Sequence, residues 1–306
     1  MLTSIMAGTA TAIYGIWHFQ RATPLSLPSN LVAMPAISAV VMPGAVCAIL
    51  AMPFGLEGYF LKAMQWGIVV MVDVAVWFSE RTPVDAVGLL PAGAMLWLTL
   101  ALLVLVVSTT RLRLLALPLA ALGFASMMDR TFPDVMITDD ARLVAIRGEA
   151  GTLAVNRPRP SSFAMDDWKR ALLSDEVKTP QKGSTKPDVH PDPASFVCEA
   201  GVCLARHRSG ALVVHAQKAD SIPPYCAEAT LVVVEDATVE HPCGPTPSAV
   251  VLTGRELARK GSASVYMPPD GEKPRVVHAI AEPWRPWHQH RAFSRASRGL
   301  PPPERR

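Results

Sequence analysis

The first 128 residues of this 306-residue chain contain very few charged side chains, although half of the whole sequence is hydrophobic. Charged residues and most of the prolines lie between residues 129 and 306. A domain surrounded by water needs charged and polar side chains on its exterior, because such side chains are rarely buried. The scarcity of charge therefore excludes an ordinary water-soluble fold for residues 1–128, and it predicts a membrane region followed by a water-exposed region.

The sequence also lacks the common catalytic signatures. No nucleophilic triad, phosphate-binding loop or dinucleotide fingerprint occurs, and "GEAGTL" at 148–153 is better explained as a hairpin turn. The pair His288 and His290 has H-x-H spacing, but Arg291 and Ala292 follow it instead of the acid and histidine that a two-metal site needs. We therefore expect no catalytic residues, no metal and no cofactor, and we do not expect enzymatic activity.

Five apolar segments divide the first region, at residues 1–17, 31–53, 60–78, 87–108 and 113–128. About 20 apolar residues are needed to cross the ~30 Å hydrocarbon layer as a helix, and 31–53 and 87–108 meet that length without a charge. The first segment has no basic stretch before its apolar core, which argues against a signal peptide. The predicted fold class is an α-helical polytopic membrane region of about five helices, in contact with the lipid bilayer.

The second apolar segment contains Pro35, Pro43 and Pro53. Proline removes a backbone donor and disturbs the preceding helical turn, and lipid tolerates freed carbonyls only where protein or water covers them. We expect this helix to be broken by its prolines and shielded inside a bundle, with Asn30 as its N-cap. Asp73, inside the third segment, costs about 2.5–3.5 kcal/mol to insert, so we expect it to face other helices or water, either as a pathway residue or as a packing group.

Loop charges give little information on orientation. The positive-inside rule is undecided, because three basic residues lie on each side of five alternating helices. The short "TTRLRLL" connection is expected in the cytoplasm, since two arginines are crowded into it. That orientation places residues 129–306 outside the cytoplasm.

An ordered set of residues in the membrane region resembles a known family. These are His18-Phe19, Arg21, Pro24-Leu25-Ser26, Asn30-Leu31, Met34-Pro35 and Pro43, followed by "GLEGYFLKAMQWGI" and continuing to about Phe78. The order is similar to the later transmembrane part of the ComEC family of competence proteins, of the alphaproteobacterial type. The resemblance implies an inner-membrane, multi-pass component of a channel that takes up single-stranded DNA during natural transformation.

The resemblance also implies a site and partners. His18, Arg21 and Asn30 become candidates for the DNA path near its mouth, and Asp73 is a poorer candidate because its charge would repel DNA. Members usually carry an N-terminal OB-like domain and earlier helices, so we expect this chain to be the C-terminal portion, working with an upstream half, other competence proteins or further copies of itself. The alternatives are a membrane-anchored, metal-dependent hydrolase or nuclease, and a truncated remnant without function.

The second region is predicted to be an α+β domain at residues 129–282, because short β-type runs alternate with small helical patterns. A polar, proline-containing stretch at 174–195 is expected to be a flexible loop. The pieces "PDVMITDDARLVAIRGEAGTLAV", "FVCEAGVC" and "WRPW" resemble the metallo-β-lactamase-like domain of the same family. The metal signature H-x-H-x-D-H is missing, so the resemblance implies a degenerate, non-catalytic copy.

Four cysteines lie in the predicted domain, and an even number in an extracytoplasmic domain favours disulfides. The pairing hypothesis is Cys198 with Cys203 and Cys226 with Cys243, and unpaired buried cysteines are the alternative. Zinc is disfavoured because only one short cysteine pair exists. The basic stretch at 283–306 is expected to be a disordered tail that attracts phosphates or lipid headgroups.

Overall fold

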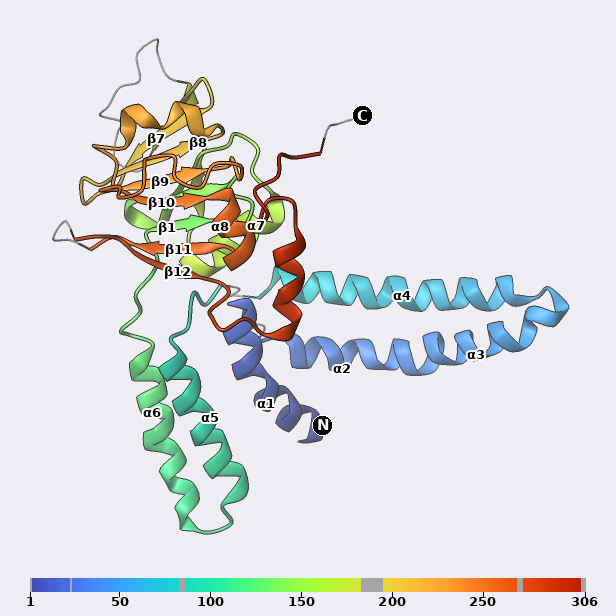
Figure 1. Cartoon of the computed structure of the whole chain (residues 1–306). Coiled ribbons are helices and arrows are strands. Elements are labelled where there is room, and N and C mark those ends of the chain that lie inside the picture. The colour runs from blue at the N-terminus through green and yellow to red at the C-terminus, as the bar shows by residue number, and fades with distance from the viewer. Residues whose placement is uncertain (1, 23, 83–85, 183–194, 269–271, 304–306) are drawn as a thin grey trace. The chain divides into compact units, whose positions relative to one another are not determined.

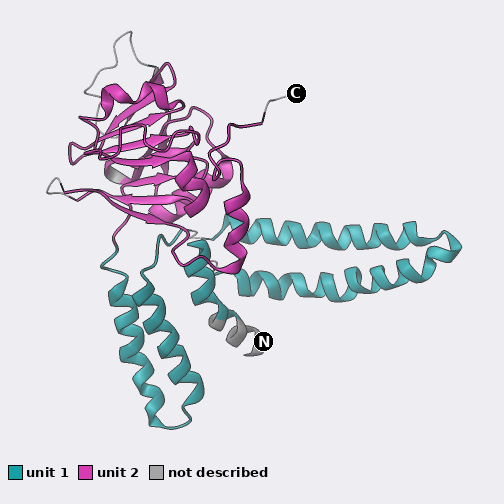
Figure 2. Cartoon of the chain, in the orientation of Figure 1, with its two compact units in different colours: residues 1–130 teal, residues 131–306 magenta. Residues whose placement is uncertain are grey.

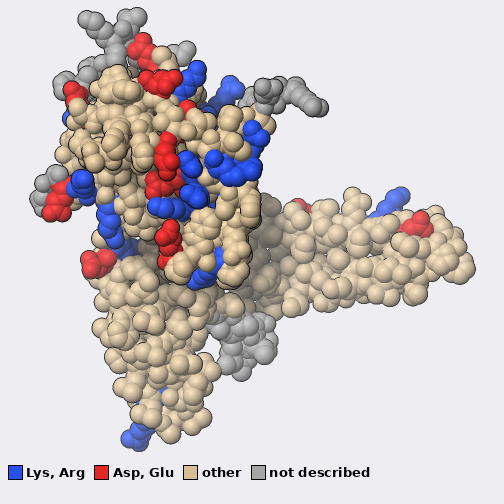
Figure 3. Space-filling view, in the orientation of Figure 1, with Lys and Arg blue, Asp and Glu red and all other residues tan. Residues whose placement is uncertain are grey.

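The computed structural model describes residues 2–22, 24–82, 86–182, 195–268 and 272–303. The chain forms two compact units, residues 1–130 and residues 131–306, shown in different colours in Figure 2. The boundary falls within two residues of the change in composition at residue 128. Figure 3 shows the same contrast, because most of the charged side chains in view lie on unit 2.

Unit 1 is helical, and helices lie in each of the five apolar segments (Figure 1). Its α-helices are α1 (Leu2–Phe19), α2 (Ser26–Ala36), α3 (Met42–Ala51), α4 (Glu57–Glu80), α5 (Ala92–Val107) and α6 (Ala116–Ser126). Two continuous helical stretches, Ser26–Phe54 and Glu57–Glu80, are long and apolar enough to cross a membrane. The α5 helix is also apolar but is shorter.

The stretch Ser26–Phe54 is one helix with an inserted π-helical turn at Ile37–Val41, bracketed by Pro35 and Pro43. The expectation that both prolines break the helix was therefore wrong. A π turn shifts the backbone bonds by one residue, as in the bond from Met42 N–H to the carbonyl of Ile37, and this accommodates prolines that lack the usual donor. Pro53 does lie at the end, in a 3-10 turn that Gly55 closes with φ +66°.

The N-cap prediction for Asn30 was also wrong. The α2 helix begins at Ser26, with Leu25 as its N-cap, so Asn30 lies inside the helix. Pro28 does not prevent this early start, because the first-turn N–H groups of a helix have no intrahelical partner in any case.

Small residues occupy the helix contacts of unit 1. Its buried side chains among the described residues are nearly all alanines, joined by buried glycines such as Gly44, Gly67 and Gly123. Large apolar side chains such as Leu50 and Trp66 point outward and are more than 60 % exposed. Water-soluble proteins bury their large apolar side chains, whereas helices in lipid pack through small residues. The packing of unit 1 is therefore the one expected in a bilayer.

Unit 2 contains two six-stranded sheets. The first sheet has the order β12-β11-β1-β2-β3-β4, with β1 (Val135–Ile137), β2 (Val144–Arg147), β3 (Thr152–Val155), β4 (Glu176–Lys178), β11 (Ala263–Tyr266) and β12 (Arg275–His278). The second has the order β10-β9-β8-β7-β6-β5, with β5 (Gln181–Lys182), β6 (Phe196–Glu199), β7 (Val202–Arg206), β8 (Leu212–Ala216), β9 (Leu231–Val234) and β10 (Val250–Thr253).

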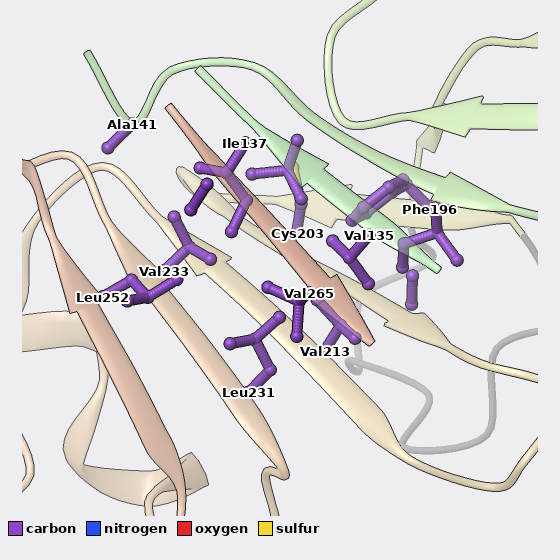
Figure 4. Packing of buried hydrophobic residues seen from close by; sticks show 14 of the residues in the cluster. Val135, Ile137, Ala141, Phe196, Cys203, Val213, Leu231, Val233, Leu252 and Val265 are labelled. Carbon is purple, nitrogen blue, oxygen red and sulfur yellow. The ribbon is translucent and has the colours of Figure 1, made fainter. Parts of the chain in front are cut away.

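The main core lies between these sheets (Figure 4). Val135 and Ile137 from the first sheet pack with Val213, Val233 and Leu252 from the second. The α7 helix (Ser162–Leu172) covers the other face of the first sheet, because its amphipathic pattern turns Met165, Trp168 and Leu172 toward β2 and β3. This layered α+β architecture has the predicted fold class for the second region.

Two disulfides occur among the described residues, joining Cys198 to Cys203 and Cys226 to Cys243. The first pair lies opposite in register on neighbouring strands β6 and β7. These are the pairs that the sequence analysis named. Part of the predicted flexible loop at 174–195 forms β4 and β5, and residues 183–194 lie outside the described residues.

Residues 283–303, which were expected to belong to a disordered tail, contain a short helix and make specific contacts with the rest of unit 2. A 3-10 helix, η7 (Pro286–Phe293), packs against α8 (Gly254–Lys260). Arg291 donates a hydrogen bond to the carbonyl of Ala258 at 3.2 Å and pairs with Asp139 at 3.1 Å. The polar composition that suggested disorder is satisfied by specific partners, which a composition argument does not consider.

Candidate functional site

Three connections of unit 1 meet at one place, which we call the loop junction (residues 20–22, 81–82, 86–87 and 127–130). Arg21 and Ala86 form an isolated antiparallel bridge, and Val87 N–H donates to the carbonyl of Gln20 at 2.9 Å. The guanidinium of Arg130 donates to the carbonyl of Val87. The ends of α1, α4 and α6 therefore lie on the same side of unit 1, as helices that alternate in direction require.

The loop junction brings together three arginines. Arg81 donates to the carbonyl of Trp77 at 3.0 Å, and its guanidinium carbon lies 4.1 Å from the Trp77 ring centroid. Arg130 also donates to the carbonyl of Met127 at 2.6 Å, while Arg21 is an exposed residue. Glu80 lies 3.8 Å from Arg81. Three cations against two carboxylates, those of Glu80 and the exposed Asp129, leave a small positive excess among the described residues at this side of unit 1.

A hollow of about 260 Å³ lies beside the junction, between the first turn of α2 and the last turns of α4. Its polar lining consists of Arg21 and four hydroxyl residues, Ser26, Ser29, Ser79 and Thr82. Because α2 begins at Ser26 without a side-chain cap, the positive end of its dipole is at this hollow. A guanidinium, hydroxyl groups and a helix N-terminus are the groups that bind phosphate oxygens.

The residues predicted for the DNA path are not brought together. Arg21 lines the hollow, but His18, Asn30 and Asp73 do not. His18 is exposed in the last turn of α1, with its ring 4.7 Å from the Trp17 ring. Asn30 is exposed on α2 and Asp73 is exposed near the middle of α4.

The hydroxyl residues were missed because serine and threonine carry no charge signal. Ser26 and Ser29 lie where one apolar segment begins, and Ser79 and Thr82 lie where the next one ends. The alternation of five helices puts those two ends on the same side. This positional signal could have identified the hollow from the sequence.

Unit 2 contains a half-buried charge cluster between its sheets, made by Glu235, Arg157 and His215. Arg157 Nη2 lies 2.6 Å from Glu235 Oε1, and His215 Nε2 lies 3.4 Å from the same oxygen and 3.0 Å from the carbonyl oxygen of Ala141. Burial raises the pKa of Glu235, but the hydrogen bond from His215 and the charges of His215 and Arg157 outweigh it and hold the pKa below its usual value. The cluster neutralises itself and has a structural role.

A second buried pair stabilises the other end of the first sheet. Asp134 lies 3.3 Å from His207 Nε2 and accepts a hydrogen bond from Met267 N–H at 2.8 Å. Burial raises the pKa of Asp134, and its bonds to His207 and Met267 lower it further than burial raises it. Across the part of the chain that the structure describes, no three His, Cys, Asp or Glu residues are grouped so that they could hold a metal ion.

Comparison with known proteins identifies one relationship. Residues 1–126 match the model of a family described as Competence protein. No curated protein and no solved structure matches the chain. The match covers almost all of unit 1 and ends before unit 2 begins.

Proposed function

We propose that this chain is a component of a channel for single-stranded DNA, because residues 1–126 match the competence protein family and that match supports a role in DNA uptake. The channel would operate in natural transformation, with unit 1 crossing the inner membrane several times. The small-residue packing of unit 1 and the two long apolar helices support a position in lipid. The observation that carries the proposal is the family match together with the phosphate-compatible hollow at Arg21.

In this proposal the hollow contacts the DNA backbone as it enters. The guanidinium of Arg21 would bind a phosphate, and the hydroxyls of Ser26 and Ser29 would bind the same or the next phosphate. Contacts of this kind do not depend on base sequence, which suits a channel that must pass any DNA. His18 and Asn30 are exposed and do not line the hollow, so they would contact the DNA outside it.

We further propose that unit 2 is a degenerate, non-catalytic domain of the metallo-β-lactamase-like type. Two packed sheets with a helix on an outer face support that architecture. The charged residues between the sheets pair with one another at Glu235 and at Asp134. Unit 2 would lie outside the cytoplasm and contact other competence proteins or further copies of the chain.

The test uses a transformable host from which its own copy of the protein has been deleted. The full-length protein is supplied in its place, either as wild type or with Arg21 replaced. Arg21→Gln removes the charge and keeps most of the side chain. One charge-assisted contact contributes about 1.5–3 kcal/mol, so transformation frequency should fall roughly tenfold to a hundredfold. Membrane levels of the protein, measured by immunoblot, should not change.

Arg111→Gln is the matched control, because Arg111 is also a loop arginine but lies on the connection between α5 and α6. It should leave transformation near the wild-type frequency. His18→Ala and Asn30→Ala test the exposed residues outside the hollow independently of the residues that line it. Wild-type frequency in both Arg21→Gln and a Ser26→Ala/Ser29→Ala variant would refute the assignment.

A further inference from the structure

The η7 helix presents three aromatic side chains on one face. A 3-10 helix has three residues per turn, so Trp287, His290 and Phe293 are aligned. All three are exposed, with Trp287 at 63 % and Phe293 at 75 %. We call these three residues the ring stripe.

The backbone that carries the ring stripe is fixed by contacts that do not involve the three rings. Arg291, on another face of η7, binds both the carbonyl of Ala258 and the carboxylate of Asp139. Ser297, just after η7, is only 2 % exposed, and its hydroxyl lies 3.0 Å from the carbonyl oxygen of Ala292. The rings therefore project from a fixed backbone at intervals of about 6 Å, the rise of one 3-10 turn.

His290 is oriented within the stripe. Its Nδ1 lies 2.7 Å from the carbonyl oxygen of Trp287, and a carbonyl can only accept a hydrogen bond. Nδ1 therefore carries the proton, and Nε2 remains on the outer edge of the ring. The imidazole can contribute a flat face and a polar edge together.

The charge around the stripe is positive. Residues 283–303 contain four arginines and no Asp or Glu. The guanidinium carbon of Arg285 lies 5.4 Å from the Trp287 ring centroid, and Arg295 and Arg298 are exposed. Arg291 is paired with Asp139, so the charge that can attract anions comes from Arg285 beside Trp287 and from the exposed Arg295 and Arg298 of the same segment.

We propose that the ring stripe, with Arg285, Arg295 and Arg298, is a stacking platform for the bases of single-stranded DNA. Exposed aromatic rings interleaved with cations are the arrangement that binds single strands without sequence preference, because every base has a flat face. A membrane-surface helix would need a broad apolar face, whereas this stripe offers only Trp287 and Phe293, with a histidine between them. The inference deepens the proposed function, on which it rests for the class of ligand.

The test measures binding of the full chain in detergent to two fluorescein-labelled 20-mers by fluorescence anisotropy. One is oligo-dT, and the other is an abasic deoxyribose-phosphate oligomer that keeps the phosphates and lacks the bases. Wild-type protein should bind oligo-dT more tightly. Loss of one stacked ring weakens binding by about fivefold to a hundredfold, so Trp287→Ala/Phe293→Ala should lose at least that much and also lose the preference for oligo-dT.

Phe163→Ala is the matched control, because Phe163 is another exposed aromatic of unit 2, at 84 %, but lies on α7. It should bind like the wild type, and Trp287→Phe should retain most of the affinity since it keeps a ring. Arg298→Gln should lower the salt dependence of log K by about 0.7, whereas the ring variants should not change it. Equal affinity for both oligomers in the wild type, or equal losses in the Phe163 control, would overturn the inference.

The two proposals fail in different ways. Unchanged DNA binding by the ring-stripe variants refutes the platform and leaves the hollow at Arg21 intact. Conversely, Arg21→Gln can leave transformation unchanged while the ring stripe still distinguishes oligo-dT from the abasic oligomer.

Discussion

At the scale of single residues, Glu235 shows how unit 2 depends on the charge of one carboxyl group. Its side chain is 16 % exposed and is bonded to Arg157, which follows β3. It also lies near His215, which is on β8. Its pKa is lowered, because its positive partners outweigh the raising effect of burial. Ionised Glu235 therefore stabilises the folded state, which binds its proton less tightly than the unfolded state does.

We predict that Glu235→Gln destabilises unit 2 by about 1–3 kcal/mol at neutral pH, because Arg157 and His215 lose a charged acceptor. The contribution of Glu235 is complete above its unfolded pKa, near 4.5, and is lost as pH falls through the lower folded value. Hydrogen exchange of the β9 amides, followed by mass spectrometry, should show the two proteins converging on acidification.

Glu240→Gln provides the comparison for that experiment. Glu240 also binds an arginine, Arg255, at 2.9 Å, but its side chain is 62 % exposed. An exposed pair contributes little to stability, so exchange in β9 should not change. If both variants behaved alike at every pH, the special role of Glu235 would be disproved.

The residue scale is also where sequence reasoning was weakest. Arg21 could be identified because it is a charge among apolar residues, and the structure places it in a polar hollow. Asn30 was misassigned because Pro28 is tolerated in the first turn, so that the N-cap of α2 is Leu25, five residues earlier. Such details depend on hydrogen bonds whose partners a single sequence does not name.

At the scale of elements, the helices of unit 1 approach one another closely at glycine residues. A Cβ added to Gly123 on α6 would lie 2.8 Å from Cδ2 and Cγ of Leu98 on α5. A Cβ added to Gly67 on α4 would lie 2.9 Å from Cγ2 of Val41. Both distances are too short for carbon atoms, so the larger side chain would push the helices apart.

We predict that Gly123→Ala lowers the stability of the α5–α6 pair by about 1–3 kcal/mol, the usual cost of overpacking. The measurement is thermal unfolding of the purified chain in detergent. Alanine also gains up to about 1 kcal/mol of helix propensity over glycine. The observed loss of stability is therefore a lower limit on the free-energy cost of the clash.

Gly93→Ala isolates that propensity gain, because a Cβ at Gly93 on α5 would meet nothing within 4 Å. This variant should be as stable as the wild type or slightly more stable. A Gly123→Ala protein that unfolds at the same temperature as Gly93→Ala would contradict the close packing described for α5 and α6.

Most elements could be predicted, because their signals are local. Apolar runs located the helices of unit 1, and short β-type runs located most strands of unit 2. The π turn between Pro35 and Pro43 and the ordered η7 could not be predicted in this way. The first is a small change in helix bonding, and the second depends on Asp139 and Ala258, which lie far away in the sequence.

At the scale of the whole molecule, the loop junction determines which helix ends share a side. Bonds among residues 20, 86, 87 and 130 place the ends of α1, α4 and α6 together. The connections at 55–56 and 108–115 lie at the opposite helix ends. With unit 1 in a bilayer, these two groups of loops would face different compartments.

We predict opposite labelling of Thr82→Cys and Thr110→Cys in a background in which Cys47 is replaced by alanine. A membrane-impermeant maleimide added to intact cells should modify one of them and not the other. Thr82→Cys should share the accessibility of a cysteine at Arg130, since both belong to the loop junction. Labelling of Thr82→Cys and Thr110→Cys from the same side would exclude the alternating arrangement.

The division into two units was readable from composition alone, because charge changes abruptly near residue 128. The arrangement of unit 2 as two sheets with a shared core was not, since strand order depends on pairings between distant segments. An example is β1, which lies between β2 and β11. Local patterns carry no record of such pairings.

Arg130 has a mechanical consequence. It is the last residue of unit 1, one peptide bond before Thr131, and its guanidinium holds the carbonyls of Met127 and Val87. The point where the chain leaves unit 1 is therefore fixed at once to the end of α6 and to the connection between α4 and α5.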